Sequence, residues 1–90
     1  MTIRRKITVE GRVQGVFYRA STRDKAFALG LAGYVLNLPN GNVLIEVEGS
    51  EEKVQELINW ARQGPPMSRV KSMIVEESEG EDLSGFEIRR

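Results

Sequence analysis

The sequence has 90 residues, of which 40% are apolar and 29% are charged, and this length suits one compact domain over residues 1–90. Its 13 basic and 13 acidic side chains cancel, so no overall field draws the chain to nucleic acid or to an anionic membrane. It contains no cysteine and no histidine, which excludes disulfides, thiol nucleophiles, thiolate zinc sites and the Ser-His-Asp triad.

The sequence also lacks the apolar segments that direct proteins into or across membranes. Residues 1–6 are partly basic but are not followed by the apolar core of a signal peptide. No apolar run approaches the roughly 20 residues that span a bilayer. We therefore expect a soluble cytoplasmic protein with no membrane or nucleic-acid partner, in which any anion-binding site is local.

The first elements predicted along the chain are a strand and a helix. Residues 3–9 form the strand, because apolar and polar residues alternate there, and we expect it to stop at Gly11. The helix begins near Phe17 and ends at Gly30. Residues at helical spacing form its inward-facing stripe: Thr22, Ala26 and Leu29.

A β-hairpin is predicted next. Residues 33–38 and 42–48 alternate in polarity and flank the turn sequence Pro39-Asn40-Gly41. An Asn-Gly pair between two such runs is the strongest short hairpin signal in a sequence. One face of the second strand is expected to carry Val43, Ile45 and Val47. Its other face is expected to carry Leu44, Glu46 and Glu48.

The second predicted helix has clear boundaries. Ser50 is a good N-cap residue, acidic residues follow it at the positive end of the helix, and Gly64-Pro65-Pro66 ends it. Its apolar residues recur at positions i, i+3, i+4 and i+7: Val54, Leu57, Ile58 and Ala61. Trp60 lies off this stripe, and we expect it to be a partly buried core residue rather than a ligand platform.

The rest of the chain closes the sheet. A fourth strand is predicted over residues 69–77, followed by a polar loop through Gly80 and Asp82 and a short closing segment over residues 86–88. The order strand, helix, strand, strand, helix, strand predicts an α+β, ferredoxin-like βαββαβ sandwich, with an antiparallel sheet and two helices on one face. Such a fold does not by itself specify a function.

The segment GRVQGVFYR, from Gly11 to Arg19, connects the first strand to the first helix. Glycines let the backbone turn its amides inward, and the first helical turn leaves N–H groups unpaired, so this connection favours an anion. A cation in that turn meets the positive helix pole at a cost of a few tenths to about 1 kcal/mol. A bound phosphoryl group, held by two guanidinium hydrogen bonds, would explain why Arg19 is there.

Plainer interpretations remain open for the two candidate polar residues. Arg19 is compatible with a surface arginine whose stem covers apolar neighbours. Asn37 is compatible with a polar residue that shapes the end of the hairpin. The residue types alone, without family information, favour these plainer interpretations. The spacing of the glycines matches neither the dinucleotide fingerprint nor the nucleotide P-loop.

Two longer motifs favour a functional role for Arg19 and Asn37 over these plainer interpretations. The segment VEGRVQGVFYR, from Val9 to Arg19, resembles the first signature of the acylphosphatase family. The segment GYVLN, which ends at Asn37, resembles the second signature together with Gly41, Val43 and Gly49. The resemblance covers the whole chain and includes the closing residues 86–89. It implies the same ferredoxin-like fold and the hydrolysis of acyl phosphates to a carboxylate and inorganic phosphate, without metal, cofactor or covalent intermediate.

The resemblance also implies roles for single residues. The family binds phosphate through main-chain amides of a loop, and the matching residues are Gln14, Gly15, Val16, Phe17 and Tyr18. The arginine that matches Arg19 binds the phosphate as well, and the asparagine that matches Asn37 orients the attacking water. We therefore expect Arg19 and Asn37 to be catalytic in a monomer whose substrate is a small acyl phosphate. Inorganic phosphate or sulfate is expected to compete.

Four positions depart from the pattern of the family. Tyr18 stands where phenylalanine is more frequent, and Leu36 stands where a longer polar or basic residue is common. Both differences are expected to affect substrate contacts near the site. The chain carries Arg89-Arg90 where an apolar or aromatic residue is usual, which leaves the packing of this segment open and is expected to have little effect on the chemistry.

Two other classes of function compete with the hydrolase. A ferredoxin-like RNA-binding module needs aromatic residues for stacking on its open sheet face. The residues expected there are instead Thr8, Glu10, Leu44, Glu46 and Glu48. The second alternative is a catalytically silent anion-sensing or regulatory domain, or a relative of the acylphosphatase domain that occurs in larger maturation enzymes. Hydrolysis of acetyl phosphate would separate an enzyme from both.

Overall fold

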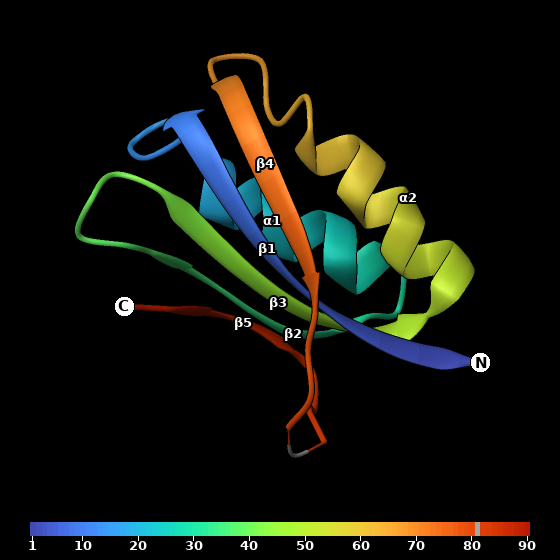
Figure 1. The fold of residues 1–90 in the computed structure, drawn as a ribbon. Coiled ribbons are helices and arrows are strands. Elements are labelled where there is room, and N and C mark those ends of the chain that lie inside the picture. The colour runs from blue at the N-terminus through green and yellow to red at the C-terminus, as the bar shows by residue number, and fades with distance from the viewer. Residues whose placement is uncertain (81) are drawn as a thin grey trace.

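A computed structural model describes residues 1–80 and 82–90, so the loop predicted near Gly80 and Asp82 includes one position outside the described residues. The elements follow in the order β1 (Thr2–Arg12), α1 (Tyr18–Ala28), β2 (Ala32–Asn37), β3 (Val43–Ser50), α2 (Glu51–Ala61), β4 (Arg69–Glu77) and β5 (Phe86–Arg89). Figure 1 shows a twisted sheet with both helices on one side of it. The ferredoxin-like sandwich is thereby confirmed.

The five strands lie in the order β4-β1-β3-β2-β5. Neighbouring strands are antiparallel except for β2 and β5, which are parallel. The sheet is therefore antiparallel, as predicted, except at the edge where β5 pairs with β2. Both β5 and β2 run opposite to β4. They are therefore parallel to each other where they pair. The predicted closing segment is thus a fifth strand that pairs with β2.

The core lies between the helices and one face of the sheet. The face of β3 predicted to carry Val43, Ile45 and Val47 is fully buried, and so are the neighbouring inward-facing residues of β1 and β2: Ile7, Val9 and Val35. The helices cover them with Tyr18, Thr22, Ala26, Val54, Leu57, Ile58 and Ala61. The Ser50 hydroxyl accepts a hydrogen bond from the Lys53 N–H at 3.3 Å, which confirms the N-cap of α2. No helix among the described residues is long and apolar enough to cross a membrane.

The prediction that β1 stops at Gly11 is wrong, because the strand continues to Arg12. Its pairing with β4 shifts register between Glu10 and Gly11, which is a β-bulge. Gly11 has φ +139°, and a Cβ atom there would lie 2.1 Å from the carbonyl oxygen of Arg69. Glycine therefore bends the strand at this point without ending its pairing.

The open face of the sheet is held together by ionic contacts. Glu46 lies there as predicted, yet only 5% of its surface is exposed, because it accepts a hydrogen bond from Arg4 Nε at 2.8 Å and another from Ser78. Tyr34 lies on the same face, and the guanidinium carbon of Arg89 is 3.9 Å from the centre of its ring. That arrangement occupies the aromatic surface that a nucleic-acid base would need.

Tyr18 connects the start of α1 to the end of α2. Its side chain is only 1% exposed, and its hydroxyl donates a hydrogen bond to the carbonyl oxygen of Ala61 at 2.7 Å. Its ring also packs against the partly buried Trp60, with the ring centres 5.9 Å apart, which confirms Trp60 as a core residue. Tyr18 therefore holds the first helical residue in place and satisfies a carbonyl near the end of α2.

Replacing Tyr18 by phenylalanine is expected to lower the free energy of unfolding by about 1 to 2 kcal/mol, because a buried carbonyl loses its donor. Burial raises the pKa of Tyr18 above its ordinary value near 10. The folded protein then keeps a proton that the unfolded chain releases, so this stabilisation is complete below pH 10 and declines above it. Urea denaturation from pH 8 to 11 should show a smaller decline for the variant. Parallel declines would contradict the assignment.

Candidate active site

The register of the sheet brings three separate segments to one end of the molecule. Val43 of β3 pairs with Val9 of β1 on one side and with Asn37 of β2 on the other. The segment after β1 therefore leaves the sheet at the end where β2 finishes. On the outer side of β2, Leu36 pairs with Arg89 of β5, so the last residues of β5 reach the same end.

The segment between β1 and α1 presents unpaired backbone donors. Within the described residues, the main-chain N–H groups of residues 14–20 donate no hydrogen bond to the protein, and the first helical bond runs from the Ser21 N–H to the Phe17 carbonyl. Phe17, the N-cap, has φ 64° and ψ 20°, a left-handed conformation that is costly for a bulky residue. The helix therefore begins at a strained turn, and its first amides have no acceptor within the described part of the protein, so an anion bound there would satisfy them.

Gln14 attaches this loop to the β2–β3 hairpin. Its side-chain nitrogen donates one hydrogen bond to the Leu38 carbonyl and another to the Asn42 carbonyl, each 2.8 Å long. Leu38 directly follows Asn37, so these two bonds place the loop beside the end of β2. Both protons of the amide are thereby used, and the Gln14 side chain is a positioning group in this structure.

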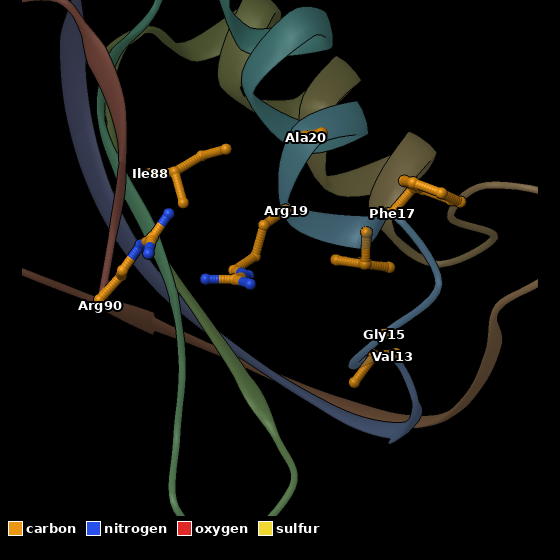
Figure 2. Close-up of a pocket in the computed structure, with 8 residues that line it drawn as sticks. Val13, Gly15, Phe17, Arg19, Ala20, Ile88 and Arg90 are labelled. Atoms are coloured by element: carbon orange, nitrogen blue, oxygen red, sulfur yellow. The ribbon is translucent and has the colours of Figure 1, made fainter.

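Arg19 extends into a pocket at the start of α1. The pocket has a volume of about 290 Å³ and is lined by Val13, Gly15, Phe17, Tyr18, Arg19, Ala20, Ile88 and Arg90. Figure 2 shows the Arg19 side chain projecting into the space between the start of α1 and the end of β5. Arg19 is half-buried, and no acidic side chain in residues 1–80 or 82–90 pairs with it.

Asn37 ends β2 on the face that the helices cover, two residues after the fully buried Val35. Its side-chain oxygen Oδ1 is buried and accepts no hydrogen bond from the described part of the chain. A buried polar atom without a partner costs about 1 to 3 kcal/mol, so native proteins keep such atoms mainly for a ligand, for an ordered water or for catalysis.

The predicted site residues fall into two groups. Four of them line the pocket: Gly15, Phe17, Tyr18 and Arg19. Gln14, Val16 and Asn37 lie outside its lining, although the register and Gln14 bring Asn37 to the same end of the sheet. The side chains of Val16 and Tyr18 are buried in the core, so the main chain is the part of these residues that a ligand could reach.

Two expectations about departures from the family need correction. The Tyr18 hydroxyl cannot contact a substrate in the pocket, because it donates to Ala61 inside the core. Leu36 pairs with Leu44 on the open face of the sheet, opposite the face that carries Asn37. Their difference from the more frequent residues therefore concerns packing and not substrate contact.

Arg90 lines the pocket, although the sequence pattern does not single it out as a site residue. In the sequence it belongs to a basic pair that is expected to have little effect on the chemistry. Strand alternation is the signal that reveals it, because Ile88 belongs to the inward-facing side of β5 and Arg90 lies two residues later. That signal becomes readable only when residues 86–89 are known to form a strand against β2.

Comparisons with known proteins agree on one family. The family model described as Acylphosphatase matches residues 5–88. An acylphosphatase of Trichormus variabilis is 48% identical over 88 residues, which cover 98% of this chain and 87% of the relative. The structure of an acylphosphatase from Coxiella burnetii is similar with a TM-score of 0.93 and 40% identity, over 98% of this chain and 93% of that one. The acylphosphatase structure from Bacillus subtilis gives a TM-score of 0.94 and 36% identity, with both chains covered completely.

The two hydrogen bonds of Gln14 can be tested through the stability of the protein. Replacing Gln14 by methionine keeps the length of the side chain but removes both bonds, and the free energy of unfolding should fall by about 1 to 2 kcal/mol. The Gln55→Met variant is the matched control, because the Gln55 side chain bonds Asn59 on the exposed side of α2. Urea denaturation of both variants measures the difference, and equal losses would contradict a positioning role for Gln14.

Proposed function

The chain belongs to the acylphosphatase family, and on that premise we propose that Arg19 and the loop amides hold the phosphoryl group while Asn37 orients the attacking water. Acylphosphatases are hydrolases that act on acid anhydrides, and they convert an acyl phosphate to a carboxylate and inorganic phosphate. The proposal concerns which groups of this chain carry out that reaction.

The reaction makes modest demands on proton transfer. The water oxygen forms a bond to phosphorus, the bond from phosphorus to the acyl oxygen breaks, and its electron pair leaves with the carboxylate. A carboxylic acid has a pKa near 4, so the leaving group departs as an anion without a general acid. The water gives up a proton, which a phosphoryl oxygen of the substrate can accept. Positioning and charge stabilisation are then the main tasks of the protein.

The unpartnered Oδ1 of Asn37 is the observation that carries this proposal. A water that donates one hydrogen to this oxygen has its lone pairs free, and one of them can point at phosphorus. The interaction would also supply the partner that the buried oxygen lacks among the described residues. Asn37 does not titrate, so it would orient water in the same way across neutral pH.

Arg19 supports the proposal through its charge and its surroundings. Its guanidinium extends into the pocket and has no acidic partner in the described part of the chain. The first turn of α1 carries no acidic residue, so the positive helix pole adds to the same field. A phosphoryl group bound by the guanidinium and by the amides of residues 14–20 would neutralise this positive charge. Its oxygens would also accept hydrogen bonds from these donors.

Hydrolysis of acetyl phosphate in the presence of EDTA tests the function and the role of Asn37 in one experiment. The protein should release phosphate well above the spontaneous rate, because no proposed step uses a metal. The Asn37→Ala variant should lose about 10² to 10³ in kcat, which is typical when one positioned polar contact is removed. Its affinity for inorganic phosphate should stay within threefold of wild type.

The control variant for this experiment is Asn59→Ala, which removes an asparagine from the exposed side of α2. Its turnover should equal that of the wild type. A kcat of Asn37→Ala within threefold of wild type would remove Asn37 from the mechanism. Wild-type protein that fails to accelerate hydrolysis would instead favour a silent anion-binding domain.

Arg19→Lys should lose nearly as much kcat/KM as Arg19→Ala, because an ammonium group cannot form two parallel hydrogen bonds to two phosphoryl oxygens. Inhibition by inorganic phosphate should weaken in both variants. Arg23→Lys serves as the control, since Arg23 lies one turn later on α1 and pairs with the exposed Asp24. Calorimetry with inorganic phosphate measures the binding, and unchanged affinity in either Arg19 variant would mean that the loop amides alone hold the anion.

A further inference from the structure

The two consecutive arginines at the end of β5 lie on opposite faces of the sheet. Arg89 lies on the open face, where its guanidinium covers the ring of Tyr34 and its Nε donates to Glu87 at 2.7 Å. Arg90 lies on the other face and lines the same pocket as Arg19. The difference follows from strand alternation, which sends successive side chains to opposite sides.

Arg19 and Arg90 converge on one space from different elements. Figure 2 shows Arg19 reaching from the start of α1 and Arg90 reaching from the end of β5, with Ile88 next to Arg90. None of the residues that line the pocket is acidic, and neither arginine has an acidic partner within residues 1–80 and 82–90. Two like charges that share a pocket repel each other, and negative charge bound in the pocket offsets that cost.

The pocket has room for more than a phosphoryl group. A phosphate has five heavy atoms and, at roughly the 30 Å³ that one water molecule takes in the liquid, it fills no more than about 150 Å³. The pocket volume is about 290 Å³, so about half of it is left for the acyl part of a substrate. Ile88 and Arg90 lie next to each other in the lining of this pocket, where Ile88 offers an apolar contact for a short carbon chain and Arg90 offers a positive charge beside it.

We propose that Arg90 is a specificity-determining residue that selects acyl phosphates whose acyl chain carries a second anionic group, such as a carboxylate. This inference rests on the proposed function, in which Arg19 and the loop amides hold the phosphoryl group. The second anion would meet Arg90 while the carbon chain passes Ile88. Selection would then come from one charge at the exposed side of the pocket, which changes affinity for the acyl group and leaves the phosphoryl chemistry unaltered.

Succinyl phosphate and butyryl phosphate form a matched pair of substrates for the test. Both acyl chains have four carbon atoms, and only the succinyl chain ends in a carboxylate. Arg90→Ala should lower kcat/KM for succinyl phosphate about three- to fivefold at low salt, the size expected for one solvent-accessible ion pair. The value for butyryl phosphate should change less than about 1.5-fold, because its chain offers no charge to lose. Arg90→Lys should recover at least half of the loss, because it restores the charge.

Arg89→Ala is the control, since it removes the same charge from the adjacent residue on the opposite face. It should leave the ratio of the two kcat/KM values unchanged. High salt should reduce the effect of Arg90→Ala, because it screens exposed charges. Equal losses on both substrates, or no loss on succinyl phosphate, would overturn the role of Arg90. If the wild type hydrolyses neither substrate faster than buffer does, the result contradicts the proposed function itself, and therefore also the inference that rests on it.

Discussion

The pairing register of the central strands is the constraint on which the rest of the site depends. Val43 stands between Val9 and Asn37 in one row across three strands, and all three side chains lie toward the helices. A shift of one residue between β2 and β3 would turn Asn37 to the open face of the sheet, and a shift of one residue between β1 and β3 would misplace the loop that leaves β1. The apolar core enforces this register, because the same shift would expose every buried valine and isoleucine of the strand that moved.

The loop between β1 and α1 depends on contacts that lie outside it. Its N-cap, Phe17, has a left-handed backbone and no side-chain cap, so local preferences alone do not favour this start of the helix. Tyr18 secures one side by its buried hydroxyl, and Gln14 secures the other through two hairpin carbonyls. The core and the hairpin therefore stabilise a turn whose amides remain free for a ligand.

The site combines groups that are each unfavourable without an anion or a water. Arg19 and Arg90 add positive charge beside a positive helix pole, and Asn37 buries an oxygen without a partner among the described residues. These features lower the stability of the folded protein, as residues selected for activity often do in active sites. The sequence contains no histidine and no cysteine, so the proposed chemistry relies on geometry and charge rather than on a side chain that transfers protons near neutral pH.

The order of the elements, most of their ends and the resemblance to the family follow from local signals in the sequence. The Asn-Gly turn, the Ser50 cap and the alternating valines are local signals, and local signals are readable without a partner strand. The motifs that end at Arg19 and Asn37 are local in the same sense, because each is a continuous run of residues. The bulge at Gly11 is not readable in this way, because a bulge depends on the strand that pairs with it.

Contacts between residues that are distant in the sequence became visible in the folded chain. It showed that the Tyr18 hydroxyl and Leu36 point away from the pocket, that Glu46 is buried on the open face, and that residues 86–89 run parallel to β2. It also separated Arg89 from Arg90, two adjacent and chemically identical residues. The physical reason is the same in each case. The direction of a side chain depends on the residues that pack against its strand or helix, and those residues lie far away in the sequence.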